Sequence, residues 1–280
     1  MNDAEPLEQL VVRARDGDRR ALERLLAAVE DDVYGLAMRM LAHPADAEDA
    51  TQEILIRVVT RLTSFRGEAA FRTWVYRVAA NHLLTTRRRR AERLELTFDA
   101  FADDLAEGLD TAYEAAGVDE DLLQREVMIG CTQGMLLCLD RPHRIAYVIG
   151  EVFELPSDQA AYVLGVSSAA YRKRLSRARE RVQSFVRGHC GIVDPANPCR
   201  CRRRVGRAIE LGRVDPGELI LAEHPRSDRV RRSVAEMEGL YDAAALFRSH
   251  PRYRAPETVV AEISALIASD RTTLLADDDG

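Results

Sequence analysis

The chain has 280 residues, of which 46% are hydrophobic and 31% are charged, and its 40 basic and 46 acidic side chains leave a formal net charge of −6. This length corresponds to two or three compact units, and the apolar fraction excludes a fully disordered chain. No apolar run approaches the ~20 residues of a membrane-spanning helix and the acidic N-terminus does not resemble a signal peptide, so we expect a cytoplasmic protein without membrane contact.

Residues 1–94 are predicted to form a helical bundle. Apolar residues recur every three or four positions over Leu22–Met40, Ile54–Leu62 and Phe71–Ala79, which is typical of helices that bury one face. Asp46 is the expected N-cap of the second of these helices. No stretch alternates with period two for long enough to predict a sheet, so the expected fold class is all-α.

The charge is divided into blocks along the chain. Ten arginines against two glutamates lie in 57–93, whereas ten acids and no basic residue lie in 95–121. Seven basic residues against one glutamate follow in 172–187, and five arginines without an acid in 200–207. Basic modules around an acidic spacer are typical of a protein that meets nucleic acid at two places, and solvated helix faces are the alternative.

The acidic block predicts a linker over residues 95–120, because it contains few strong core formers; a transient helix and a plain soluble tether are alternatives for it. A second helical module is expected over residues 121–187. Residues 188–280 form an extension that opens with a stretch rich in Cys, Pro and Gly. Helical patterns resume there at Val230–Phe247 and Thr258–Ile267.

The clearest local pattern is a helix-turn-helix within the second module. We expect Ser157 to cap its first helix, Gly165 to form the turn, and Ser167 or Ser168 to cap its second helix. That second helix has one apolar stripe and is otherwise basic, which is the geometry that inserts a helix into the major groove. An ordinary helical hairpin with a basic face is the alternative. The expected DNA contacts are Ser168, Arg172, Lys173, Ser176 and Arg177.

The segment 64–81 interleaves aromatic residues with arginines. Aromatic rings beside cations suit single-stranded nucleic acid, because an unpaired base stacks on a flat surface and its backbone needs a positive charge. The helical spacing of Phe71 and Trp74 is nevertheless more typical of a core. The loop 64–70 is therefore the better candidate for holding an extruded base.

These stretches resemble the extracytoplasmic-function (ECF) sigma factors of bacterial RNA polymerase. The second conserved domain of that family is matched by DAEDATQE at 46–53, by FRGEAAFRTW at 65–74 and by Asn81. The fourth domain is matched by the helix-turn-helix that ends in RLSRARE at 174–180. The two matches are collinear and cover roughly residues 7–187.

The resemblance implies a dissociable initiation subunit whose partners are core RNA polymerase and promoter DNA. An acidic helix would face the basic clamp helices of the largest polymerase subunit, and acids that complement a helix dipole are the alternative interpretation. The acidic linker would run through the polymerase toward its active site and RNA-exit channel. The implied polymerase-binding residues are Asp46, Glu48, Asp49, Gln52 and Glu53.

The resemblance also implies how the promoter is divided between the modules. The loop 64–70 and the helix 72–90 would read and melt the minus-ten element, and the helix 168–182 would read the minus-thirty-five element. The promoter sequence itself does not follow, because the start of this last helix departs from many relatives. The implied contacts in the first module are Phe65, Arg66, Trp74, Arg77, Asn81, Arg87 and Arg88.

The extension carries thiols at Cys190, Cys199 and Cys201. With His189 or His224 they would complete a tetrahedral zinc site, but the spacing is not that of a standard finger. A redox-switchable pair and plain structural thiols are the alternatives, and the last is favoured, so no metal or cofactor is predicted. The other two cysteines, Cys131 and Cys138, are expected in the core.

Two further function classes fit the sequence less well. An enzyme finds little support, since the chain has no Walker-type loop, no His-Glu-x-x-His and no coherent set of nucleophile and base. A helix-turn-helix regulator that binds duplex DNA as a dimer explains residues 157–182 but leaves residues 46–81 without a role. For a sigma factor, the expected regulators are a separate anti-sigma protein or the extension itself, docked on either DNA-binding module.

Overall fold

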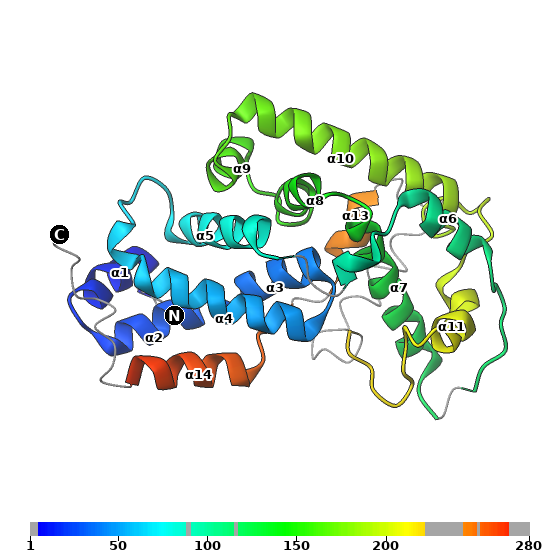
Figure 1. Cartoon of the computed structure of the whole chain (residues 1–280), viewed down its shortest axis with the longest axis horizontal. Helices are drawn as coiled ribbons and strands as arrows, with labels where there is room; N and C mark the ends of the chain where they lie inside the picture. The colour runs from blue at the N-terminus through cyan, green and yellow to red at the C-terminus, as the bar shows by residue number, and fades with distance from the viewer. Residues whose placement is uncertain (1–4, 88–90, 115–116, 222–242, 251–252, 269–280) are drawn as a thin grey trace.

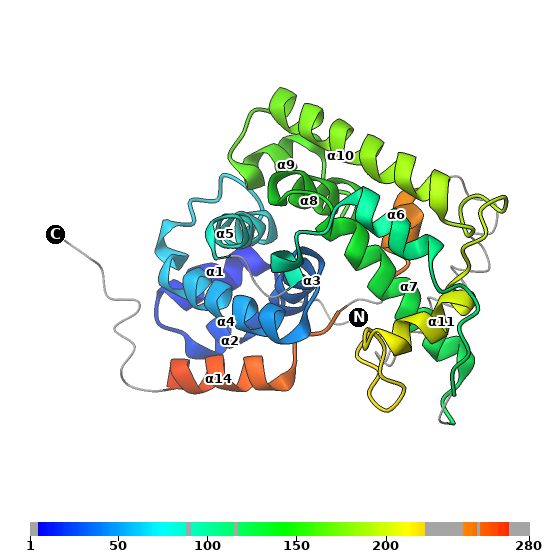
Figure 2. The same cartoon turned by 45° about the vertical axis from the view of Figure 1, so that its right-hand side comes forward.

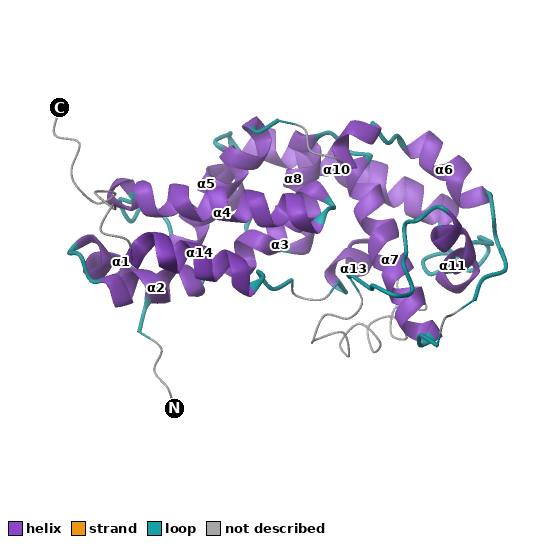
Figure 3. Cartoon of the chain, turned by 60° about the horizontal axis from the view of Figure 1, so that its bottom comes forward, coloured by secondary structure: helices purple, strands orange, loops and turns teal. Residues whose placement is uncertain are grey.

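The computed structural model describes residues 5–87, 91–114, 117–221, 243–250 and 253–268 (Figure 1). Within these ranges all regular structure is helical, apart from one isolated β-bridge, which confirms the all-α fold class (Figure 3). None of the helices described there is long and apolar enough to cross a membrane.

The first bundle consists of five α-helices and one short 3-10 helix. They are α1 (Leu7–Arg15), α2 (Arg19–Ala27), α3 (Glu30–Leu41), α4 (Pro44–Thr60), the 3-10 helix η1 (Leu62–Ser64) and α5 (Phe71–Thr85). The expected cap at Asp46 is wrong. Pro44 takes the first position of α4, where its fixed φ suits a helix start, and the ring Nδ1 of His43 accepts a hydrogen bond from the Asp46 backbone N–H at 3.4 Å.

The second bundle begins with a helical turn and a short helix, of which only the short helix lies within the acidic block. Its elements are η2 (Ala91–Leu94), α6 (Phe98–Ala106), α7 (Glu120–Leu137), α8 (Arg141–Tyr147), the π-helical turn η3 (Val148–Val152), α9 (Ser157–Leu164) and α10 (Ser168–His189). Within the acidic block, α6 packs on α10, where the ring of Phe101 stacks on Phe185 at a centroid distance of 5.6 Å. Residues 98–106 are thus part of the folded body.

The extension contributes α11 (Cys201–Glu210), α13 (Ala243–Arg248) and α14 (Glu257–Ala268). Each packs on a different part of the molecule: α11 on α7, α13 on α10 and η3, and α14 along α4 and α2 (Figures 1 and 2). The predicted helix at Thr258–Ile267 is confirmed by α14, whereas most of the pattern at Val230–Phe247 lies outside the described residues.

Two charge blocks neutralise each other. The acids of the predicted linker face the arginines of α11, with Arg203 to Asp110 at 2.6 Å and Arg204 to Asp104 at 3.1 Å. The two segments also touch through their backbones, since a Cβ on Gly206 would lie 1.9 Å from the carbonyl oxygen of Thr111. The arginine run at 200–207 therefore binds the acidic segment of the same chain. From its charge alone, this arginine run could not be distinguished from a surface that binds nucleic acid.

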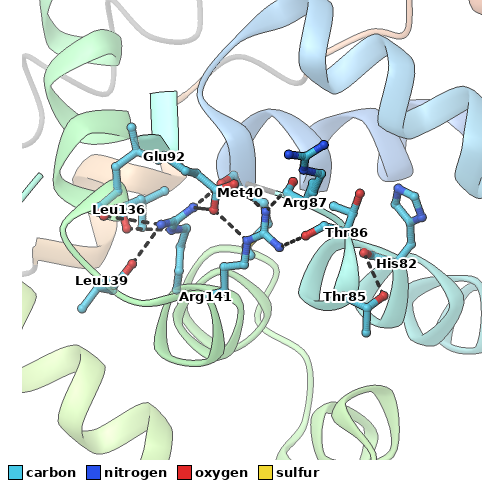
Figure 4. A network of polar contacts seen from close by, with 11 residues as sticks. Met40, His82, Thr85, Thr86, Arg87, Glu92, Leu136, Leu139 and Arg141 are labelled. Atoms are coloured by element: carbon cyan, nitrogen blue, oxygen red, sulfur yellow. Dashed lines mark hydrogen bonds and ion pairs between the residues drawn. The ribbon is translucent and has the colours of Figure 1, made fainter. Parts of the chain in front are cut away.

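A buried ion network joins the two bundles (Figure 4). Arg144 donates to the carbonyl oxygens of Leu136 and Leu139, each at 2.9 Å, and to that of Met40 in α3. The carboxylate of Glu92 accepts from Arg144 at 3.0 Å and from Arg141 at 2.6 Å. Burial lowers the pKa of Arg144, partly offset by Glu92, because a charge removed from water needs paired partners.

The extension fills the junction between the bundles. The Arg39 guanidinium of α3 lies 4.8 Å from the ring centroid of Tyr253 and 5.4 Å from that of Phe153, so it contacts one ring of the extension and one of the second bundle. The Tyr253 hydroxyl accepts a hydrogen bond from Gln133 Nε2 at 2.8 Å. His250 is buried beside these groups, with Nε2 against the hydroxyl of Thr132.

We expect acidification to loosen this junction. Burial, reinforced by the Arg39 charge, holds the pKa of His250 well below its ordinary value of 6.5. The folded chain then binds fewer protons than the unfolded chain, so this contribution to stability is complete above pH 6.5 and is lost as the pH falls, by about 1.4 kcal/mol per pH unit. Urea unfolding of the wild type and of His250→Gln between pH 7 and pH 5 measures it. Equal pH slopes in both proteins would contradict the assignment.

Candidate nucleic-acid interface

The helix-turn-helix of α9 and α10 is built largely as its local sequence predicts. Gly165 ends α9 in the left-handed region at φ 63°, where a glycine has no Cβ penalty. The Ser167 hydroxyl then caps α10 by accepting from the Ala170 N–H at 3.2 Å. Only the Ser157 cap is wrong, because Pro156 occupies the N-cap position and α9 begins at Ser157 itself.

The predicted stripe of α10 is buried and its predicted DNA contacts face solvent. Tyr171 and Val182 are at most 1% exposed, and all of α10 lies on the outer side of the molecule (Figure 1). Exposed side chains occupy four of the five predicted positions, and Ser168 is half-buried at the start of the helix. Within the part of the chain that the structure describes, none of the exposed four forms an ion pair. They are Arg172, Lys173, Ser176 and Arg177.

Other arginines of α10 have partners in the fold. Arg179 pairs with Glu151 of η3, and the Arg181 guanidinium lies 5.3 Å from the ring centroid of Phe98. Of the exposed basic residues for which no ion pair is found among the described residues, Arg172, Lys173 and Arg177 lie in the first turns of α10 and Arg187 lies on its last turn. We call the exposed surface of Arg172, Lys173, Ser176 and Arg177 the α10 face.

The loop before α5 is held from α1. Arg15 donates to the carbonyl oxygen of Leu62 at 2.8 Å and to that of Phe65. Glu8 accepts from the backbone N–H of Phe71 at 3.3 Å, which satisfies one donor at the start of α5. The loop 64–70 thus has a fixed base and leaves Arg66 and Glu68 exposed.

The aromatic residues of this segment are core. Phe65 and Trp74 are 6% and 7% exposed and Phe71 is fully buried, with centroid distances between the three rings of 5.5 to 5.7 Å. The core interpretation of Phe71 and Trp74 therefore holds. In this conformation the three rings cover one another, so Phe65 and Trp74 present little of their surface to a base.

A hollow of about 270 Å³ lies between this loop and α9. Its lining is mostly polar and consists of Ser64, Arg66, Glu68, Trp74, Arg77 and Tyr162. The Arg77 guanidinium stacks 4.6 Å from the ring centroid of Tyr162, and α9 packs on α5 (Figure 1). The sequence around Tyr162 does not predict that it lines this hollow, because only the packing of the two bundles brings it beside Arg77.

The remaining predicted contacts of the first module differ in exposure. Arg66, Asn81 and Arg87 are exposed, and Arg77 is half-buried beneath Tyr162. Arg88 lies outside the described residues. We call the surface of Arg66, Arg77, Asn81 and Arg87 the α5 face. The structure therefore leaves the α10 face open and covers part of the α5 face.

The predicted polymerase-binding residues all lie on α4. Asp49 and Glu53 are exposed and Glu48 is half-buried, whereas Asp46 is buried at the start of the helix. Gln52 is half-buried because its Nε2 donates to Glu262 Oε2 of α14 at 2.8 Å. This acidic side of α4, hereafter the α4 face, lies next to a helix of the extension.

The thiols of the extension gather near α7. Cys190 and Cys199 form the isolated β-bridge, and burial raises the pKa of the Cys131 thiol on α7, with a smaller contribution from the neighbouring thiols of Cys190, Cys201 and Cys199. Burial also raises the pKa of the Cys201 thiol. His189 Nδ1 forms a hydrogen bond with the carbonyl oxygen of Phe185 at 2.9 Å. Among the described residues, which exclude His224, no group of three or more His, Cys, Asp or Glu side chains is arranged to hold a metal ion.

Comparison with known proteins gives consistent relatives. The family description Sigma-70 region 2 matches residues 25–93, which contain α4 and α5. The RNA polymerase sigma-H factor of Pseudomonas aeruginosa is 30% identical over 183 residues, which cover 64% of this chain and 93% of that protein. The ECF RNA polymerase sigma factor SigW of Bacillus subtilis is 28% identical over 185 residues, covering 65% and 97%.

Another relative and a solved structure extend this comparison. The ECF RNA polymerase sigma-E factor of Escherichia coli K12 is 29% identical over 181 residues, which cover 63% of this chain and 92% of that protein. The structure of CnrH in complex with the cytosolic domain of CnrY is similar at a TM-score of 0.46 and 23% identity, over 64% of this chain and 96% of that one.

Proposed function

Because the chain belongs to the extracytoplasmic-function sigma factors of RNA polymerase, we propose that its two DNA-facing surfaces divide promoter recognition between them. The protein directs bacterial core RNA polymerase to promoters and starts transcription there. The α10 face reads the minus-thirty-five element in the major groove, and the α5 face reads and melts the minus-ten element. The polymerase catalyses RNA synthesis, so the chain needs no catalysis of its own. Its place of action is the cytoplasm, where the polymerase is.

The availability of the α10 face is the observation that carries this proposal. Arg172, Lys173 and Arg177 lie on exposed turns directly after the cap at Ser167, and the next arginine, Arg179, is already paired with Glu151. Arginine forms two hydrogen bonds with a guanine edge, and a helix start is the part that reaches furthest into the groove.

The α4 face supports binding to core polymerase. Asp49 and Glu53 present carboxylates on its exposed side, where the basic clamp helices of the largest polymerase subunit are the complementary surface. The buried Asp46 acts differently, since it lies in the first turn of α4, where a negative charge favours the helix dipole. Asp49 and Glu53 are therefore the stronger candidates for direct contact, with Glu48 beside them.

The chain divides accordingly into residues 1–94, which bind polymerase and the minus-ten element, and residues 121–187, which bind the minus-thirty-five element. Residues 95–120 connect them through the polymerase, and residues 188–280 form a regulatory extension. A dimeric regulator leaves the α4 face without a role, so binding of the purified chain to core polymerase separates the two functions. Transcripts with discrete starts from a promoter library would then define the promoter.

Replacing Arg177 by alanine tests the α10 face. We expect the holoenzyme to lose about 5- to 150-fold, or ~1–3 kcal/mol, of its preference for a specific promoter over one with a scrambled minus-thirty-five element. Arg187→Ala is the matched control, because Arg187 is exposed on the last turn of the same helix and should change both affinities equally. Equal losses on both promoters for Arg177→Ala would show that this residue contacts only phosphate.

A further inference from the structure

The last described helix lies against the helix that we assign to polymerase binding. Val259 and Ile263 of α14 are buried, at 0% and 5% exposure, in the packing of α14 on α4 and α2 (Figures 1 and 2). On the same side, Glu262 holds Gln52 of the α4 face at 2.8 Å. Docking is completed at the start of the helix, where the Ala255 N–H donates to Asp31 Oδ1 at 3.0 Å.

The same extension fastens the two bundles to each other. Tyr253 lies only four residues before α14 and contacts Arg39 of the first bundle and Gln133 of the second. Phe247 of α13 packs edge-on against Tyr147 at a centroid distance of 5.3 Å. With the bundles held in this way, α9 stays over α5 and Tyr162 covers Arg77 of the α5 face.

The extension also holds the acidic segment between the bundles. Asp104 pairs with Arg204 at 3.1 Å and with Arg213 at 2.6 Å, and Asp110 pairs with Arg203 at 2.6 Å. The Arg204 guanidinium further donates to the carbonyl oxygen of Glu107. Residues after 188 thus contact the α4 face and the connecting segment directly, whereas the α5 face is covered by Tyr162 of α9.

We propose that α14 is a built-in inhibitor of the sigma factor, because it occupies the side of α4 that carries Gln52 and competes there with the basic clamp helices of core polymerase. This inference rests on the proposed function, since it needs α4 to be the polymerase-binding helix. Only the fraction of molecules with α14 undocked binds polymerase fully, so the apparent affinity is reduced by that fraction.

Ile263→Arg in the full-length chain tests the competition. A charge at this buried position undocks α14, and we expect the affinity for core RNA polymerase to rise by about tenfold or more, which corresponds to ~1.4 kcal/mol. Thr258→Arg is the matched control, because it places the same charge on an exposed position of the same helix and should leave the affinity unchanged. Affinity in Ile263→Arg equal to or weaker than that of the wild type would overturn the proposal.

Amide hydrogen exchange shows that a variant has opened without unfolding. In Ile263→Arg, exchange should accelerate in α14 and at the exposed side of α4, while α3 and the core of α10 keep the protection of the wild type. If protection is lost throughout, the milder Val259→Thr takes its place, since the two side chains have nearly the same shape and only a hydroxyl is buried. Unchanged affinity in a Val259→Thr protein whose α14 exchanges faster would equally overturn the proposal.

The outcomes separate this inference from the function on which it rests. Failure of the wild type and of every variant to bind core polymerase would remove the proposed function. Equally tight binding by all of them would leave that function in place and remove the inhibition. Tighter binding by Ile263→Arg alone supports both.

Discussion

Replacing Arg144 by leucine is expected to lower the free energy of unfolding by about 3–5 kcal/mol, because it leaves a buried carboxylate without one of its partners. Arg144 and Glu92 are each 4% exposed at their side chains. The substitution also removes the donor shared by the carbonyl oxygens of Met40, Leu136 and Leu139. The network spans both bundles, so the loss falls on the whole fold.

Urea unfolding followed by circular dichroism measures this loss. Arg187→Leu makes the same change at an exposed position of α10 and should alter the unfolding free energy by less than about 0.5 kcal/mol. A loss below about 1 kcal/mol in Arg144→Leu would mean that Arg141 alone satisfies Glu92, with which it pairs at 2.6 Å.

Replacing Trp74 by alanine is expected to cost about 3–5 kcal/mol of stability, as for other large side chains removed from a core. Trp74 is 7% exposed and packs between Phe65 and Phe71 at centroid distances of 5.6 and 5.7 Å. The neighbouring rings also fix the base of the loop 64–70, so the hollow beside it should lose its shape with the indole.

Trp74→Phe separates the core role of this residue from stacking on a base. Phenylalanine keeps most of the apolar volume and should cost far less stability than alanine. Trp74 is the only tryptophan of the chain, so circular dichroism must replace intrinsic fluorescence as the probe. A Trp74→Ala protein with wild-type stability and weakened promoter melting would reverse our assignment and make the indole a direct DNA contact.

The elements whose signals are local could be predicted from the sequence. The stripe from Tyr171 to Val182, the left-handed Gly165 and the cap at Ser167 each depend on neighbours within a few residues, and the structure has all of them. The helix starts at Asp46 and Ser157 were misplaced because the adjacent prolines, Pro44 and Pro156, changed where each helix begins.

The candidate site was less predictable, because its geometry depends on contacts between distant segments. Arg77 and Tyr162 are 85 positions apart in the sequence and meet only when α9 packs on α5. Gln52 and Glu262 are separated by 210 positions. The charge blocks showed which segments are basic and which acidic, but the pairing of Arg203 with Asp110 required the fold that brings α11 beside the acidic segment.

Because α14 lies near the end of the chain, it is synthesised after the helices on which it packs. Ribosomes add about 5–20 residues per second, so the 210 positions between Gln52 and Glu262 correspond to roughly 10–40 s of translation. The first bundle is complete before α14 exists, and for that interval α14 does not contact the side of α4 that carries Gln52. We therefore expect each new copy to pass through a state in which α14 does not yet contact α4. Core polymerase that reaches the nascent chain in this state meets no competition from α14.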